Sequence, residues 1–353
     1  MPFQLNEKLR KLKPYDPITG SYPIRLDANE SCLPIEEEER AAMVEVAQSI
    51  NLRRYPDHEA TGLCQAAAAY YGTKPALLTA WNGTDEAILL LCTAFLGRGA
   101  ALLSYALDFS MYHFNAYLTG AEVVKLPKND DFTIDIEATI EALYQHRPEM
   151  FVFSNPCNPT SLVLPQAQVR RMIAAARETG TLVALDEAYM DFSDQSLIDE
   201  VADHDNLVIL RTCSKAPGLA GLRLGFSLAN PVLTKALRAV KSPYNVGELT
   251  QALGEAMLRQ PVRLQEGTAE LCRRRDELSR GLRGLGFHVA GDAANFVFVR
   301  DAARYFEPLK VQGIVVRCFG GHLRITAGTQ EENGALLSAL KELKEEQSCE
   351  PQP

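Results

Sequence analysis

The sequence predicts an α/β protein in which helices cover both faces of a mostly parallel sheet, followed by a smaller α+β unit. Short apolar runs alternate with helical patterns through the first 230 residues, and these runs are continuously apolar rather than alternating. Beyond Pro231 the sequence pattern changes, and apolar residues recur mainly at helical spacing. Continuously apolar strands are typical of parallel sheets, because both of their faces are buried.

The composition is typical of a soluble globular protein. The 353 residues are 46% hydrophobic and 23% charged, enough for one large core and a smaller second one. A net charge of -9 argues against a nucleic-acid binder, which would carry a basic face. The longest apolar run, at residues 87–96, is far shorter than the ~20 residues of a membrane span, and we expect no signal peptide. Eight cysteines without metal-binding spacing predict a reducing cytoplasm and no structural metal.

The predicted elements follow the chain in three parts. Residues 1–28 are expected to form an arm that packs on the small domain or a partner subunit, because Pro14, Pro17, Gly20 and Pro23 interrupt any long element. The large domain is expected over residues 29–246. It begins with an acidic helix start at residues 34–40, and we predict strands at residues 77–80, 100–104, 122–126, 150–153, 181–185 and 207–210, with helices at 87–96 and 166–179.

The second domain is expected over residues 247–346. Helical periodicity runs from residue 248 to 285, short strands are predicted at residues 296–299, 314–316 and 323–326, and a closing helix at residues 330–346. Residues 347–353 are polar and predict a disordered tail.

Four polar side chains each follow a different predicted strand: Asn82, Asn158, Asp186 and Lys215. Each has an ordinary structural explanation, since Asn82 and Asp186 can cap helices, Asn158 lies in an Asn-Pro turn, and Lys215 can be a surface lysine. Together they are better explained by a site, because ligands of open α/β sheets bind beyond the carboxyl ends of the strands.

The residue types fit pyridoxal 5'-phosphate. This cofactor needs an amine, a carboxylate for its ring nitrogen, a donor for its phenolic oxygen and an anion site for its phosphate. Lys215 supplies an amine that is well placed to form a Schiff base, and Asp186 supplies a carboxylate directly after an apolar strand. Asn158 and Tyr189 are candidate donors to the phenolic oxygen.

The anion site is predicted at the start of the helix that follows Gly83, Thr84 and Asp85. Free backbone N–H groups and the positive end of the helix dipole favour a phosphate there. Ser214 and Arg223 add a hydroxyl and a bidentate cation. The sequence contains neither the GxGxxG nor the GxxxxGK[ST] motif, so no second phosphate loop competes.

These residues also carry a family resemblance. The chain resembles the fold-type I pyridoxal-phosphate aminotransferases over nearly its whole length, and within them the histidinol-phosphate branch. DEAY (186–189), NPCNPT (155–160) and SKAPGLAGLRLGF (214–226) are highly specific for the superfamily. The more specific stretches for the branch are LKPY (12–15), LDANE (26–30), PYNV (243–246) and LRITAGT (323–329), while RYPD (54–57) and NGTDE (82–86) also match.

The resemblance implies a large domain with a seven-stranded sheet, a homodimer with shared active sites, and roles for particular residues. Lys215 is expected to bind the cofactor covalently and move the substrate proton, while Phe109 stacks on the ring where the family has tyrosine. Tyr55 is expected to reach the phosphate of the partner subunit. The expected substrate-binding residues are Tyr15, Asn29, Arg317 and Arg324, with the last two holding the substrate's anion.

The implied reaction is transamination between L-histidinol phosphate and 2-oxoglutarate in histidine biosynthesis. The chain departs from the family at Ser31-Cys32, Phe109 and Ser161, and its segment between Arg317 and Arg324 is short. The short segment borders the substrate, and together with Phe109 it predicts a more apolar pocket, so an aromatic amino acid aminotransferase is the nearest alternative. A threonine-phosphate decarboxylase, which shares the cofactor site, is a more distant one. An aminotransferase-like transcription regulator would need an added basic DNA-binding domain, and here the catalytic pattern begins almost at once.

Overall fold

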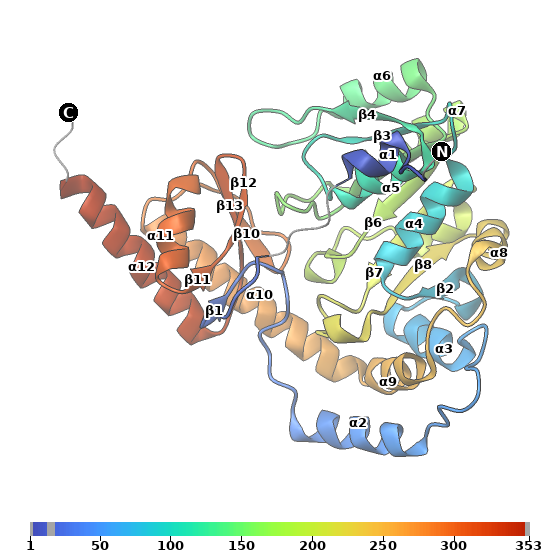
Figure 1. The fold of residues 1–353 in the computed structure, drawn as a ribbon, viewed down its shortest axis with the longest axis horizontal. Helices are drawn as coiled ribbons and strands as arrows, with labels where there is room; N and C mark the ends of the chain where they lie inside the picture. Colours follow the sequence, from blue (N-terminus) through green and yellow to red (C-terminus); the bar gives the residue numbers. More distant parts are fainter. Residues whose placement is uncertain (1–2, 13–17, 350–353) are drawn as a thin grey trace.

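A seven-stranded sheet organises the larger of the two units of the molecule (Figure 1). The computed structural model describes residues 3–12 and 18–349. The strand order is β2-β8-β7-β6-β5-β3-β4. The strands are β2 (Leu78–Trp81), β3 (Ala101–Tyr105), β4 (Glu122–Leu126), β5 (Met150–Ser154), β6 (Leu182–Asp186), β7 (Leu207–Thr212) and β8 (Gly225–Ala229).

All pairings in this sheet are parallel except those of β8, which runs antiparallel to both β2 and β7. The predicted mostly parallel sheet is therefore confirmed. The register places Ser154 beside Asp186, and Asp186 beside Leu210. The carboxyl ends of β5, β6 and β7 consequently lie level at one edge of the sheet, where the sequence predicted the site.

Helices cover both faces of this sheet, as the continuously apolar strands require. One core contains buried residues of α3, α6 and α7, and the core on the opposite face contains residues of α4, α5 and α8. The helices of this unit are α2 (Glu37–Ser49), α3 (Thr61–Tyr71), α4 (Thr84–Phe95), α5 (Met111–Thr119), α6 (Ile136–His146), α7 (Gln166–Thr179) and α8 (Pro231–Val240). Four of them, α3, α5, α6 and α8, were not predicted as elements, and the Gln166–Thr179 helix has the predicted bounds.

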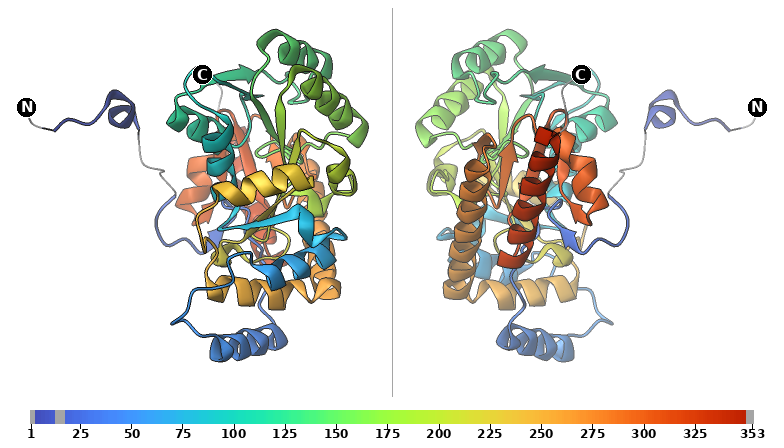
Figure 2. Two further views of the ribbon diagram at one scale, coloured as in Figure 1. Left: turned by 90° about the vertical axis from the view of Figure 1, so that its right-hand side faces the viewer. Right: turned by 90° about the vertical axis from the view of Figure 1, so that its left-hand side faces the viewer.

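The smaller unit is built on a four-stranded antiparallel sheet of order β12-β13-β10-β9. Its strands are β9 (Val289–Gly291), β10 (Phe296–Val299), β12 (Arg317–Phe319) and β13 (His322–Thr326), and its helices are α10 (Pro261–Gly284), α11 (Phe306–Val311) and α12 (Gln330–Cys349). Figure 2 shows α10 and α12 lying side by side along this unit. Buried residues of α10, α12, β10 and β13 share one core.

The N-terminal arm contributes to both units. β1 (Ile24–Arg25) pairs in parallel with β11 (Ile314–Val315) of the smaller unit, and Leu26 is buried in its core. α1 (Glu7–Lys11) contacts the larger unit, because the Lys8 amine donates to the main-chain carbonyl of Leu118 in α5. The predicted limits of the domains, and the prediction that the arm packs on the small domain or a partner subunit, stay predictions.

The helical run predicted for residues 248–285 is interrupted. It forms α9 (Glu248–Leu258) and α10, separated at Arg259 and Gln260, because Pro261 has no backbone N–H and starts the next helix. Met257 and Leu258 of α9 lie in the core of the larger unit, so the boundary expected after residue 246 precedes a helix that packs on that unit. α12 continues through Cys349, three residues beyond the predicted helix end.

Candidate active site

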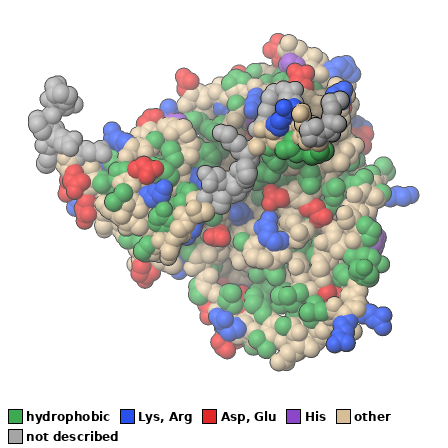
Figure 3. All heavy atoms as spheres, in the orientation of Figure 1, with side chains coloured by type: hydrophobic (Ala, Val, Ile, Leu, Met, Phe, Trp, Pro, Cys, Tyr) green, Lys and Arg blue, Asp and Glu red, His purple; other side chains and the backbone are tan. Residues whose placement is uncertain are grey.

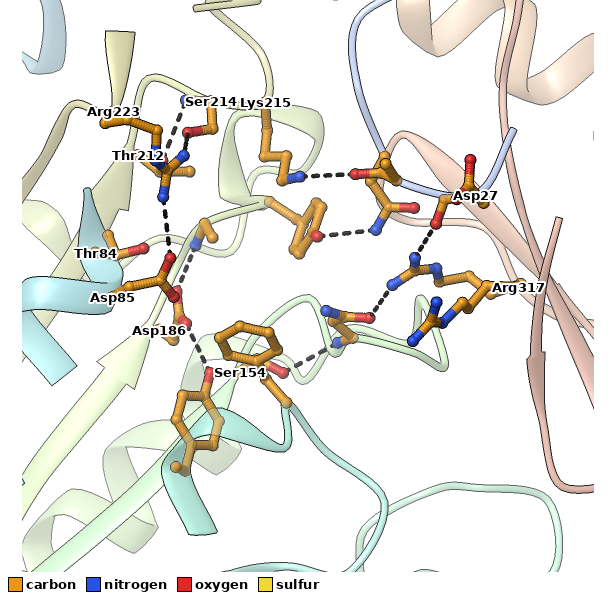
Figure 4. Close-up of a pocket in the computed structure, with 18 of the residues that line it drawn as sticks. Asp27, Thr84, Asp85, Ser154, Asp186, Thr212, Ser214, Lys215, Arg223 and Arg317 are labelled. Atoms are coloured by element: carbon orange, nitrogen blue, oxygen red, sulfur yellow. Dashed lines mark hydrogen bonds and ion pairs between the residues drawn. The ribbon is translucent and has the colours of Figure 1, made fainter. Parts of the chain in front are cut away.

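A cavity of about 300 Å³ lies between the two units (Figure 4). One wall comes from the carboxyl ends of β5, β6 and β7 and the start of α4, and the opposite wall from arm residues 25–29 and strands β12 and β13. In the space-filling view, acidic and basic side chains gather in the hollow between the units (Figure 3). Of the predicted residues, those lining the cavity are Asn29, Thr84, Asp85, Phe109, Asn158, Asp186, Tyr189, Ser214, Lys215, Arg223, Arg317 and Arg324.

Asp186 is the last residue of β6 and is buried. Its carboxylate accepts hydrogen bonds from the Tyr112 hydroxyl at 2.6 Å and from the Ala188 N–H at 3.0 Å. Burial raises the pKa of Asp186 to about 6, although both hydrogen bonds act in the opposite direction. A buried carboxylate of this kind is stabilised by a cationic partner, which is what a protonated pyridine nitrogen offers.

Tyr112 was missed by the sequence reasoning. It lies on α5, is fully buried, and is 74 residues from Asp186 in the sequence. Nothing in the local pattern around residue 112 indicates this partner, because the contact depends on how α5 packs against the sheet. The ring of Phe109, predicted to stack on the cofactor, lies edge-on to Tyr112 at a centroid distance of 5.5 Å.

Lys215 projects from the turn that follows β7 toward the opposite wall (Figure 4). The turn is closed by the Gly218 N–H, which donates to the Lys215 carbonyl at 3.0 Å. The Lys215 amine donates to the carbonyl of Ala28 at 3.1 Å and lies 5.8 Å from the centre of the Tyr189 ring. The amine is therefore held in the cavity by a main-chain acceptor from the arm.

The predicted anion site lies where β8, α4 and the Lys215 turn meet. The Arg223 guanidinium lies 3.0 Å from the Asp85 carboxylate and 3.5 Å from the Ser214 hydroxyl. Glycine is favoured at two positions here: Gly83 has a φ of 80°, and a Cβ on Gly225 would lie 2.8 Å from the Thr84 backbone nitrogen. Thr84 and Asp85 at the start of α4, Ser214 and Arg223 thus line the same cavity, and their amides, hydroxyl and guanidinium are groups that bind phosphates.

Hydrogen bonds join the arm, the large-unit loops and the small sheet on the other side of the cavity. The Asn29 amide donates to the Tyr189 hydroxyl at 2.9 Å, and the Asn29 N–H donates to the Thr326 hydroxyl at 3.0 Å. Arg324 donates to the Asn158 side-chain oxygen at 2.7 Å and also to the carbonyl of Asp27. The side chains of Asn158 and Tyr189, predicted to face the cofactor's phenolic oxygen, are therefore already oriented by partners.

Arg317 and Arg324 face each other across the pairing of β12 and β13, and both line the cavity. The Arg324 guanidinium lies 5.4 Å from the ring centres of both Phe296 and Phe319. Like charges directly opposite on a sheet repel, so an anion between them is favourable. The short connection between the two strands places Phe319 next to this basic pair.

Ser161, which stands where the family has glycine, keeps the conformation that glycine favours. Its φ is 55°, and its hydroxyl accepts from the Ala294 N–H at 2.8 Å and donates to the Phe296 carbonyl at 2.9 Å. These two bonds tie the loop after β5 to the small sheet. The side chain thus makes contacts that glycine cannot make, which offset the cost of the left-handed backbone.

Four predicted positions lie outside the cavity or outside the described residues. Gly83 lies beside Arg223 at the start of α4 but does not line the cavity. Asn82 is exposed, and its N–H donates to Glu86 at 2.6 Å, so it does not join the rim cluster as we expected. Tyr55 is 80% exposed and stacks on Tyr244 at a centroid distance of 4.5 Å, away from the cavity. Tyr15 lies outside the described residues.

The model of the aminotransferase class I and II family matches residues 22–340, nine-tenths of the chain. The chain belongs to this family. Among curated relatives, the histidinol-phosphate aminotransferase of Clostridium novyi is 33% identical over 341 residues, covering 94% of this chain and 95% of that protein. Histidinol-phosphate aminotransferase 1 of Carboxydothermus hydrogenoformans is 36% identical over 352 residues, covering 97% and 99%.

Solved structures confirm the fold-type I architecture of this aminotransferase. The histidinol-phosphate aminotransferase of Sinorhizobium meliloti, in complex with pyridoxal-5'-phosphate, superimposes with a TM-score of 0.88 at 26% identity, covering 97% of this chain and 98% of that one. The L-threonine-O-3-phosphate decarboxylase of Porphyromonas gingivalis has a TM-score of 0.77 at 21% identity, covering 91% and 99%, and shares the fold. The fold therefore does not separate the two reactions.

Within the described residues there is no group of His, Cys, Asp and Glu side chains arranged to hold a metal ion. Searching the same residues finds no helix long and apolar enough to cross a membrane.

Proposed function

We propose that this aminotransferase transfers an amino group between L-histidinol phosphate and 2-oxoglutarate with pyridoxal 5'-phosphate, giving imidazole-acetol phosphate and L-glutamate in histidine biosynthesis. The observation that carries the proposal is one cavity that holds Lys215 and Asp186 on one wall and two arginines on the other. The relatives at 33% and 36% identity over nearly the whole chain support the same reaction.

The large-unit wall is the part that we expect to hold the cofactor. Asp186 keeps a proton on the ring nitrogen because a buried carboxylate stabilises a neighbouring cation. When bound, pyridoxal phosphate withdraws electrons from the substrate's α-carbon. The Lys215 amine is the base that accepts the proton from this carbon, and its turn holds the amine at the cavity.

The remaining residues of this wall bind and orient. The backbone amides of Thr84 and Asp85, which follow Gly83, together with Ser214 and Arg223, hold the phosphate. The Arg223 guanidinium lies 3.0 Å from the Asp85 carboxylate. We expect it to donate hydrogen bonds to both that carboxylate and the phosphate. The other roles are those of Asn158 and Tyr189 at the phenolic oxygen and of Phe109 on the face of the ring.

The opposite wall binds the substrate's anion in this proposal. Arg324 holds the carboxylate of glutamate or the phosphate of histidinol phosphate, and Arg317 adds the second positive charge that a phosphate dianion requires. Asn29 is already bonded to Tyr189 and Thr326, so it orients this wall toward the cofactor. Tyr15 is expected to join them.

We further propose a cytoplasmic homodimer with shared sites, whose other partners are the small amino donor and the 2-oxo acid. Exposed Tyr55 and the neighbouring Leu52, 73% exposed, support a surface that a second subunit covers. Seven described cysteines are free, which is consistent with a reducing compartment. Equilibrium ultracentrifugation tests the dimer, and a monomer at micromolar concentration would contradict it.

A half-reaction screen tests the function. The purified cofactor-loaded enzyme is mixed singly with L-histidinol phosphate, L-glutamate, L-phenylalanine and L-threonine phosphate, and the absorbance of bound cofactor and the product masses are followed. We expect fast conversion to the pyridoxamine form with histidinol phosphate and glutamate.

Two other outcomes of the screen would replace the proposal. Phe109 in the cavity and Phe319 beside Arg324 favour an aromatic substrate as the second candidate, and a preference for phenylalanine would establish it. Carbon dioxide release from threonine phosphate without conversion of the cofactor would place the protein among the decarboxylases.

A further inference from the structure

A lysine and a cysteine meet behind the loop that carries Asn158. The Lys128 amine lies 2.9 Å from the Cys157 sulfur, although the two residues are 29 positions apart. Lys128 follows β4 and Cys157 follows β5, so the contact joins two loops at the same edge of the sheet. Neither residue lines the cavity between the units.

The pair lines a second cavity of about 370 Å³. Its other walls include Phe132, Ile134 and Leu164. Cys157 itself is buried, and its sulfur also lies 3.9 Å from the carbonyl of Leu107. A cavity of this size admits water and molecules of similar size, such as hydrogen peroxide.

The charges around the pair keep the Lys128 amine protonated. Burial lowers the pKa of Lys128, but the neighbouring Cys157 sulfur and Asp108 carboxylate outweigh burial and raise that pKa above its ordinary value. The amine therefore stays positively charged beside the sulfur. At 2.9 Å from the sulfur, the amine is placed to donate a proton to a leaving group and, once neutral, to attack the sulfur itself.

The pair is also connected to the proposed catalytic wall. Cys157 directly precedes Asn158, whose N–H donates to the Ser154 hydroxyl at 3.0 Å and whose side chain accepts from Arg324. The Ser154 hydroxyl in turn donates to Asp108. A change at Cys157 thus acts on a residue that lines the first cavity.

We propose that Cys157 and Lys128 form a peroxide-reactive site that closes into a covalent sulfur–nitrogen linkage. The thiolate sulfur attacks one oxygen of hydrogen peroxide and the O–O bond breaks, so the sulfur is oxidised by two electrons and the peroxide is reduced. The Lys128 ammonium gives a proton to the departing hydroxide, which leaves as water. The neutral amine then attacks the sulfenic acid, the S–O bond breaks, and a second water leaves.

Cys32 beside Arg274 offers a comparison for Cys157 beside Lys128. Cys32 also has a cation nearby, because the Arg274 guanidinium lies 3.7 Å from its sulfur. A guanidinium stays protonated in proteins and has no free amine to attack a sulfenic acid. Any oxidation of Cys32 should therefore give no linkage to Arg274, and burial raises the pKa of the Cys32 thiol although that guanidinium acts in the opposite direction. Burial also raises the pKa of the buried Cys92 thiol, to about 12.

Peptide mass analysis of the full-length protein tests the proposal. The protein is treated with hydrogen peroxide, blocked with iodoacetamide, and digested with trypsin and a glutamate-specific protease, which separates the two residues because Glu137, Glu141 and Glu149 lie between them. We expect a pair of peptides joined through Lys128 and Cys157, about 2 Da lighter than the sum of the free peptides, since the linkage removes two hydrogens. Dithiothreitol should restore both free peptides.

Variants make the result specific. Lys128→Arg keeps a positive charge and should lose the linked pair, and Cys157→Ser should lose it as well, whereas Cys32→Ser should retain it at the wild-type yield. If Lys128→Arg or Cys157→Ser fails to fold, the presence or absence of the linked pair in the wild-type protein still tests the proposal. Absence of the linked pair in peroxide-treated wild-type protein overturns the proposal.

Discussion

The two walls of the cavity are built in different ways. The wall with Asp186, Ser214 and Lys215 comes from the ends of adjacent strands and the turns directly after them. The wall with Asn29 and Arg324 is held by hydrogen bonds between residues up to 297 positions apart. The first wall, the sheet wall, is therefore fixed by one sheet. The second, the composite wall, depends on how the arm, the loop after β5 and the small sheet come together.

This difference predicts that changes in the two walls have separate consequences. A change in the sheet wall should act on the cofactor and on the chemical step. A change in the composite wall should act on the substrate and leave the cofactor in place. The predictions for Lys215, Arg324 and Arg317 below test this separation, and the one for Tyr112 tests how the first wall holds Asp186; they run from the largest expected effect to the smallest.

Lys215→Ala should lower the turnover number by at least about 10³-fold, because the cavity loses its amine for proton transfer. Steady-state transamination and the absorbance of bound cofactor are the measurements. Lys235→Ala, a change at an exposed lysine of α8, should keep normal turnover. Wild-type turnover in Lys215→Ala would show that another group does this chemistry.

Arg324→Ala should lower kcat/KM for glutamate by about 10²-fold, because a charge-assisted contact to the substrate's anion is lost. Cofactor affinity, followed by fluorescence titration, should change less than about threefold. Arg304→Ala, at an exposed arginine of the same unit, is the matched control.

If Arg324→Ala weakens cofactor binding as strongly as it weakens the glutamate reaction, the two walls do not have separate functions. Arg317→Ala gives a second measurement of the same wall. Its side chain is only half-buried, and we expect a smaller loss, about tenfold. An unchanged glutamate half-reaction in Arg324→Ala would contradict the proposed anion site.

Tyr112→Phe should shift the pH dependence of stability in the ligand-free protein. The folded-state pKa of Asp186, about 6, lies above the ordinary value of 3.8, so the folded state holds this proton more tightly than the unfolded chain. The free energy of unfolding therefore falls as pH rises through this interval, by up to about 3 kcal/mol from this group. Tyr112→Phe removes a donor that lowers this pKa, so the fall should extend to higher pH.

Denaturant unfolding between pH 4 and 8 measures this effect. Asp108, Glu187 and Asp191 also have raised pKa values because of burial, so only the difference between variant and wild type is assigned to Asp186. Asp186→Asn is the control and should flatten part of the fall. Identical pH profiles for Tyr112→Phe and the wild type would show that the Tyr112 hydrogen bond does not influence Asp186.

The sheet wall was largely predictable from the sequence. Strand ends can be read from apolar runs, and the carboxyl ends of parallel strands share an edge, so Asn158, Asp186 and Lys215 were expected together. Asn82 also follows a strand end, as predicted, but its side chain does not point into the cavity. Its N–H donates to Glu86, and its side chain is exposed. A strand end fixes the place of a residue and not where its side chain points.

Contacts that depend on packing between distant elements were not predictable in this way. The hydrogen bond from Tyr112 to Asp186 and the Lys215 amine's bond to the Ala28 carbonyl both cross between elements with no sequence relation. The break between α9 and α10 is different, since Pro261 was visible in the sequence and a continuous helical pattern concealed its effect. For Arg317 and Arg324, only the family resemblance pointed to a shared site.

The long-range bonds of the arm also set the order in which the site is completed during synthesis. The Asp27 carbonyl accepts from Arg324, which follows it by 297 residues. At about 5–20 residues per second, a ribosome needs roughly 15–60 s to make that partner. The sheet wall, complete once β8 has been made, precedes it by about 5–20 s at the same rate. A nascent chain therefore acquires the wall for the cofactor before it acquires the wall for the substrate.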